Sequence, residues 1–116
     1  MNKHHSINYV ECPVGDLTLA KRFFSAVFGW SFTDYGPEYC AFNGAGIAGG
    51  FFQSDLCMST EVGSALLVLY SDNLEVTQAA IEAAGGAIVK PAFSFPGGRR
   101  FHFIDPNGNE FAVWSE

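Results

Sequence analysis

The chain has 116 residues, of which 48% are hydrophobic and 16% charged, a composition typical of one folded domain and not of a disordered chain. Its net charge of −6 makes nucleic acid and anionic membranes poor partners, because both repel an acidic surface. No apolar run approaches the roughly 18 residues of a membrane span, and the N-terminus has no secretory h-region. We therefore expect a single cytoplasmic domain, residues 1–116, with no membrane or nucleic-acid partner.

The first half of the chain predicts one strand, one helix and then three strands. Residues 7–12 alternate as in a strand, and Asp16 is a good N-cap for a helix that ends at Gly29. Strands are expected at 30–34, 38–43 and 47–53, between glycine-rich turns. Residues 55–63 have no periodicity and are interpreted as a linker.

The second half repeats this order. Residues 64–70 predict a strand, and a second helix starts near Asn73 and ends at a glycine pair. A short strand at 87–90 follows. Residues 93–98 combine phenylalanines with glycines and are interpreted as a loop, either a lid over a binding cleft or a hairpin loop with buried phenylalanines.

The sequence between residues 101 and 114 predicts a β-hairpin. Pro106 suits the first central position of a turn and Gly108 the left-handed position after it, which gives a three-residue loop between Asp105 and Asn109. Strand alternation then places apolar side chains on one face, which should carry the helices: Phe101, Phe103, Phe111 and Val113. The other face is a plausible pocket wall: Arg100, His102, Ile104, Glu110, Ala112 and Trp114.

Equivalent positions in the two halves are 57 residues apart, as at Leu17 and Leu74 or Gly29 and Gly86. The chain is therefore expected to contain two modules, residues 6–54 and 64–116, joined by the linker 55–63. The predicted fold is α+β, with two tandem βαβββ modules that form a curved mixed sheet around a concave cleft and helices on the convex face.

Three segments resemble the vicinal oxygen chelate superfamily, which includes glyoxalase I, extradiol dioxygenases and bleomycin-resistance proteins. They are residues 7–17, residues 23–30 and the Asp-Pro-Asn-Gly-Asn of residues 105–109. The resemblance implies paired βαβββ modules and a homodimer.

The resemblance also implies metal ligands at four places, and these correspond to Tyr9, Gly50, Leu66 and Ala112. Family members with metal chemistry carry His or Glu there, and none of these four residues supplies an imidazole or a carboxylate. We therefore expect no metal site and no cofactor, and we lean against an enzymatic activity.

Strand parity predicts which residues line the cleft and bind a ligand: Tyr9, Glu11, Phe52, Leu66, Val68, Tyr70, Arg100, His102, Ala112 and Trp114. His102 is the only candidate catalytic residue, as a general base or a hydrogen-bond donor, and its alternative is a histidine bonded within the sheet. Arg100 is interpreted either as a clamp for a carboxylate or as half of a surface ion pair.

Three functions follow as hypotheses. The first is a metal-free, homodimeric protein that binds or sequesters an aromatic or cationic small molecule in an aromatic cleft. The second is a metal-dependent lyase, isomerase or dioxygenase of the glyoxalase type. The third is a dimeric interaction or regulatory module with a vestigial cleft.

Overall fold

The computed structural model describes residues 2–116 and contains the two predicted modules. The first module consists of β1 (Tyr9–Val14), α1 (Leu17–Phe28), β2 (Ser31–Asp34), β3 (Tyr39–Asn43) and β4 (Ala48–Gln53). A short 3-10 helix, η1 (Thr60–Val62), lies in the connecting segment. The second module consists of β5 (Leu67–Tyr70), α2 (Leu74–Ala83), β6 (Ala87–Phe95), β7 (Gly98–Ile104) and β8 (Glu110–Ser115). The α+β class and the tandem βαβββ order are confirmed.

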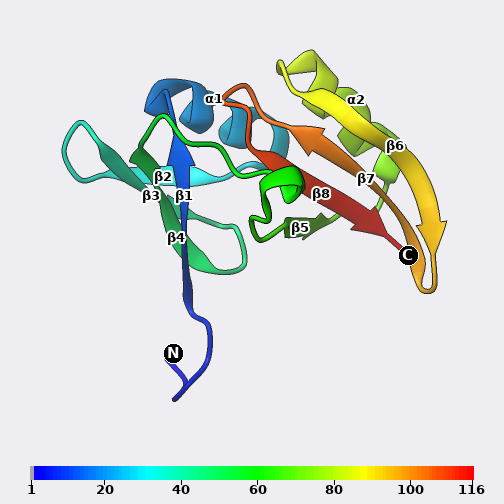
Figure 1. Ribbon diagram of the computed structural model, residues 1–116, viewed down its shortest axis with the longest axis horizontal. Helices are drawn as coiled ribbons and strands as arrows, with labels where there is room; N and C mark the ends of the chain where they lie inside the picture. The colour runs from blue at the N-terminus through cyan, green and yellow to red at the C-terminus, as the bar shows by residue number, and fades with distance from the viewer. Residues whose placement is uncertain (1) are drawn as a thin grey trace.

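Each module forms its own four-stranded mixed sheet, in the order β1-β4-β3-β2 and β5-β8-β7-β6. The first strand of each module is parallel to the last, and the other pairs are antiparallel. Glu11 pairs with Gly50 in the first sheet, and Val68 pairs with Ala112 at the equivalent point of the second. The modules lie side by side with α1 and α2 next to each other (Figure 1).

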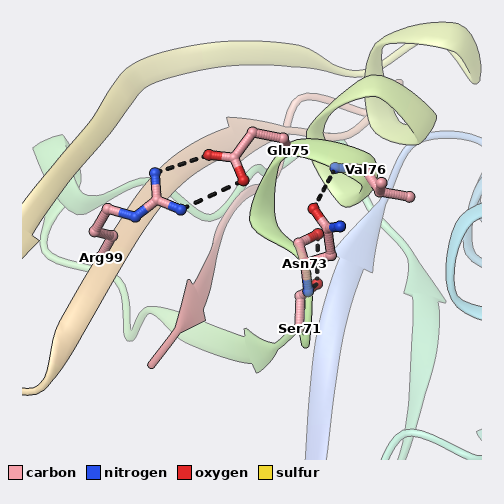
Figure 2. A network of polar contacts seen from close by, with 5 residues as sticks. All are labelled: Ser71, Asn73, Glu75, Val76 and Arg99. Carbon is pink, nitrogen blue, oxygen red and sulfur yellow. Dashed lines mark hydrogen bonds and ion pairs between the residues drawn. The ribbon is translucent and has the colours of Figure 1, made fainter.

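Side-chain caps fix where the two helices begin. The Asp16 carboxylate accepts a hydrogen bond from the Leu19 N–H at 3.1 Å, and Gly29 ends α1 with a φ of +72°. Figure 2 shows the equivalent cap of α2, where the Asn73 side chain accepts from the Val76 N–H at 3.1 Å. The predicted start of each helix is confirmed.

The core lies between the helices and the two sheets, and α1 bridges both modules. The Phe24 ring lies 5.4 Å from that of Phe51 in β4 and 5.3 Å from that of Phe111 in β8. The apolar face predicted for the closing hairpin is buried in this core, with every member at most 1% exposed: Phe101, Phe103, Phe111 and Val113. Burial of this face fixes the orientation of the opposite face, which carries the polar residues of β7 and β8.

The predicted hairpin register is confirmed at every pair from Arg100 and Trp114 to Ile104 and Glu110. The Asp105 N–H donates to the Asn109 carbonyl oxygen at 2.9 Å, and Gly108 takes a φ of +89°. The Asn109 side chain is fully buried. It accepts from the Met58 N–H at 2.7 Å and donates to the Pro13 carbonyl oxygen at 2.6 Å. This loop therefore ties the linker and the end of β1 to the second module.

The loop predicted at residues 93–98, for which a lid and a hairpin loop were the two alternatives, is wrong in its extent. β6 continues to Phe95, and Pro96-Gly97 makes a two-residue turn into β7, with Phe95 opposite Gly98. β6 accommodates Pro91 because it is an edge strand and its pairing is irregular between Lys90 and Phe93. None of the helices within residues 2–116 is both long and apolar enough to cross a membrane.

Candidate functional site

The polar face of the second sheet contains a small cavity of about 220 Å³. Four side chains from four strands line it: Val68, Phe95, Arg100 and Trp114. Tyr70 packs edge-on against Trp114, with ring centres 5.0 Å apart. Three of the four lining residues were predicted from strand parity, and Phe95 was assigned to a loop instead. We call this hollow the second-module cavity.

Of the residues that the structure describes, Arg100 is the only charged one that lines the second-module cavity. Its guanidinium lies 5.3 Å from the ring centre of Phe93 and 5.8 Å from that of Phe95, within the range of cation–π attraction. Within residues 2–116 no carboxylate pairs with Arg100, and its buried Nε has no hydrogen-bond partner. The adjacent Arg99 differs, because it forms two hydrogen bonds to Glu75, at 2.8 and 3.3 Å (Figure 2). Of the two arginines, Arg99 therefore forms the surface ion pair.

His102 lies on the same face two residues from Arg100 and is 3% exposed. Its Nδ1 is 2.8 Å from Oε2 of Glu110, and Oε1 of Glu110 accepts from the N–H and the hydroxyl of Thr60 at 2.8 and 2.9 Å. Burial favours the neutral acid, but the hydrogen bonds from His102 and Thr60 outweigh it, so the pKa of Glu110 is lowered. The imidazole is held by its Nδ1, and its buried Nε2 has no partner among the described residues.

The equivalent face of the first module carries a different cluster. The Tyr39 hydroxyl donates to Oε2 of Glu11 at 3.0 Å and also forms a short hydrogen bond with the Tyr9 hydroxyl. Burial raises the pKa of Tyr39, and its bonds to Tyr9 and Glu11 raise it further. The ring of Tyr39 lies over Gly50, where a Cβ would overlap the tyrosine hydroxyl. Tyr39 thus fills the space of a side chain at residue 50.

The ten predicted ligand residues fall into separate groups. Tyr9, Glu11 and Phe52 lie on the first sheet. Val68, Tyr70, Arg100, His102, Ala112 and Trp114 lie on the second, where Ala112 is fully buried. Leu66 lies outside these groups and lines a larger apolar cavity of about 440 Å³, together with Val10 of β1 and Val68 of β5. In the described chain no side-chain hydrogen bond or aromatic contact joins the group on the first sheet to the group on the second.

Sequence reasoning missed Tyr39 and Phe93 as parts of these clusters. Tyr39 lies in the strand predicted at residues 38–43. It shares a strand face with Ala41, which is opposite Gly50, so strand alternation could have placed it once β3 was paired with β4. The Phe93 ring lies tilted against the His102 ring, with ring centres 6.0 Å apart, and its alternation with Phe95 was the signal for a continuing strand.

The residues at the four metal places of the fold do not fit a divalent ion. The hydroxyl of Tyr9 is hydrogen-bonded to that of Tyr39, and a side chain at Gly50 would clash with Tyr39. Ala112 is buried and has an apolar side chain that cannot coordinate a metal. Among residues 2–116, no three side chains of His, Cys, Asp or Glu are close enough to hold a metal ion together. His102 and Glu110 are a pair without a third donor.

Comparisons with known proteins agree with this architecture. No curated protein matches the chain. A glyoxalase-related enzyme from Fulvimarina pelagi is 23% identical, with a TM-score of 0.72 over 97% of this chain and 88% of its own. A genomically encoded fosfomycin resistance protein from Listeria monocytogenes is 16% identical, with a TM-score of 0.78 over 98% and 95%. A lactoylglutathione lyase from Agrobacterium tumefaciens is 18% identical, with a TM-score of 0.71 over 98% and 96%.

At these identities the structural matches show a shared fold. The sequence match is more specific, because the family model of the Glyoxalase/Bleomycin resistance protein/Dioxygenase superfamily covers residues 6–113, nearly the whole chain. It spans both modules, including β1 with its Tyr9 and the Asp105–Asn109 loop that carried the resemblance. The chain therefore belongs to the Glyoxalase/Bleomycin resistance protein/Dioxygenase superfamily.

Proposed function

We propose that this chain is a small-molecule-binding member of its superfamily that works without a divalent metal. The observation that carries the proposal concerns Gly50, one of the four places where relatives with metal chemistry carry a metal ligand. The Tyr39 hydroxyl occupies the space that a metal-binding side chain would need, and it is held there by Tyr9 and Glu11. A tyrosine, a glycine, a leucine and an alanine at the four places leave no imidazole or carboxylate to coordinate an ion.

The residues that line the second-module cavity favour an aromatic ligand over a cationic one. Its walls are the rings of Phe95 and Trp114 and the side chain of Val68, which suit a flat apolar molecule. The charged residue in its wall is Arg100, and this positive charge disfavours a cation at this position. Binding or sequestration of an aromatic compound is therefore the role we assign to this cavity.

We further propose a homodimer in which the first-sheet cluster of one copy covers the second-module cavity of the other. In the single chain both faces are open, with Tyr9 46%, Val68 44% and Tyr70 49% exposed. Apolar side chains exposed together on two sheet faces are typical of surfaces that associate. Light scattering on the purified protein should give twice the chain mass, and a monomer at micromolar concentration would exclude this arrangement. The location we propose is the cytoplasm, in keeping with three cysteines that form no disulfide among residues 2–116.

A second candidate function rests on the His102–Glu110 pair. A carboxylate on Nδ1 orients the imidazole and leaves Nε2 to exchange a proton with a bound molecule, so His102 is suited to act as a general base. A lyase or isomerase reaction that begins with removal of a proton from the substrate needs a base of this kind. The free Nε2 is the specific observation in its favour.

A thermal-shift screen with a panel of aromatic compounds, with and without EDTA, tests the first proposal. A ligand at 100 times its dissociation constant should add about 2.7 kcal/mol of stability, equally in both conditions. Val68→Trp is the matched variant, because residue 68 lines the cavity, is 44% exposed and can carry an indole without a clash in the core. We expect this variant to keep its fold and lose the shift. Stabilisation that disappears with EDTA would contradict a metal-free site.

A further inference from the structure

The charge distribution around Phe93 is unusual for an acidic protein. The chain has a net charge of −6, yet the ring of Phe93 has Lys90 Nζ 5.5 Å and the Arg100 guanidinium 5.3 Å from its centre. Neither cation has an ion-pair partner among residues 2–116, whereas Lys21 and Arg99 each pair with a carboxylate. Two cations without an ion-pair partner among residues 2–116 therefore lie together at the ring of Phe93, and one of them, Arg100, lines the second-module cavity.

The Arg100 side chain is positioned by packing and not by an acid. Two phenylalanine rings contact its guanidinium, and it contributes directly to the cavity wall beside Trp114. Aromatic rings displace water from the faces of a guanidinium, and its N–H groups stay available to an acceptor in the guanidinium plane. The buried Nε of Arg100 has no acceptor among the described residues. An unpaired cation at the wall of an aromatic hollow is suited to an anionic group of a ligand.

A second buried nitrogen lies on the same face. His102 is 3% exposed, is fixed through Nδ1 to Glu110, and its Nε2 also lacks a partner. Residues 100 and 102 point to the same side of β7 because strand side chains alternate. One face of one strand thus holds two buried nitrogens that have no hydrogen-bond partner among the described residues, and an unmet buried polar group is costly unless a ligand supplies the bond.

We propose that the ligand of the second-module cavity is an aromatic carboxylate, with its carboxylate on Arg100 and its ring against Phe95 and Trp114. This inference rests on the proposed small-molecule function and adds the chemical class of the ligand. The carboxylate geometry matches the two parallel N–H groups of a guanidinium, which a neutral amide cannot reproduce. An amine of the same shape is repelled by Arg100.

The test is calorimetric titration of the intact protein with naphthalene-2-carboxylate, its neutral carboxamide and the corresponding naphthylmethylamine. We expect the carboxylate to bind at least about tenfold more tightly than the carboxamide, the factor that loss of one charged hydrogen bond gives. Arg100→Gln should abolish this preference, and Arg99→Gln, the adjacent arginine that faces Glu75, should retain it. Circular dichroism confirms the fold of each variant, and the comparison of the three compounds on the unaltered chain stands even if Arg100→Gln does not fold.

The outcomes separate this inference from the function on which it rests. Equal binding of carboxylate and carboxamide, unchanged in Arg100→Gln, would overturn the anionic class while the small-molecule function survives. Tighter binding of the amine would overturn it as well. If no compound binds, and Glu11→Gln dissociates the dimer to the same extent as Arg100→Gln, the counter-charge of Arg100 comes from Glu11 of a second copy and the inference is wrong.

Discussion

Gly50→Ala tests whether the Tyr39 ring occupies the space that a side chain at residue 50 would need. A Cβ at residue 50 would overlap the Tyr39 hydroxyl and would lie 2.6 Å from Cζ of Tyr39 and 2.7 Å from the Cys40 carbonyl oxygen. The Tyr39 ring can rotate away only by losing its hydrogen bonds to Tyr9 and Glu11, and the Cys40 oxygen is backbone and has to move with its strand. Overpacking of this kind costs about 1–3 kcal/mol, so we expect a loss of about 2 kcal/mol and a fall in Tm of about 8 °C.

Urea unfolding followed by far-UV circular dichroism measures the effect, and Gly15→Ala is the matched control. A Cβ at residue 15 would meet its nearest atoms, Asn107 Oδ1 and the Ser54 carbonyl oxygen, at 3.8 and 3.9 Å, which is ordinary contact. We expect Gly15→Ala to change the free energy of unfolding by less than about 0.5 kcal/mol or to raise it. Removing the ring with Tyr39→Ala should restore part of the loss in a Gly50→Ala background. If Gly50→Ala and Gly15→Ala prove equally stable, residue 50 has room for a side chain and Tyr39 does not block a donor there.

Two further predictions concern the hairpin loop. Burial raises the pKa of Asp105 from 3.8 to about 6. Asp105 binds its proton more tightly in the folded state, and this proton binding contributes to the free energy of unfolding. The contribution is complete below pH 3.8 and is lost as the pH rises through about 6. In urea unfolding, the stability of the native protein relative to Asp105→Asn should therefore fall by up to about 3 kcal/mol between about pH 4 and about pH 7, and a constant difference would show that Asp105 titrates normally. Asn109→Ala should cost about 2–4 kcal/mol, because it leaves the Met58 N–H and the Pro13 carbonyl oxygen without their partner. The exposed Asn43→Ala is its control, and equal losses in the two variants would contradict the bridging role of Asn109.

The features that sequence reasoning predicted correctly are those that depend on nearby residues. The turn at Pro106 and Gly108 and the strand alternation on either side fix the hairpin register, and with it the pairing of His102 with Ala112. The capping residues Asp16 and Asn73 similarly mark the helix starts. Because the apolar face of the hairpin had to be buried, the polar face and most of the second-module cavity followed from the same alternation.

The features that sequence reasoning missed depend on contacts between distant segments. Tyr39 covers Gly50 only because β3 pairs with β4, and the separation between Tyr39 and its partner Glu11 is set by the sheet and not by the chain. Pro91 and the glycines after Phe95 favoured a loop at residues 93–98, but the edge position of β6 tolerates the proline. Strand parity also could not show that the ten predicted ligand residues divide between two sheets, because it assigns a side chain to a face of its strand but not to a neighbouring strand.

Elemental analysis tests the central claim most directly. The purified protein would be incubated with zinc, nickel, manganese and iron(II) salts, desalted and measured for metal per chain. A chain whose four family places are Tyr9, Gly50, Leu66 and Ala112 should retain less than about 0.1 equivalent of any of these metals, because residues 2–116 bring no three donor side chains together. Retention of about one equivalent, lost in Glu11→Gln or His102→Ala, would show a metal centre built from other residues and would contradict the account.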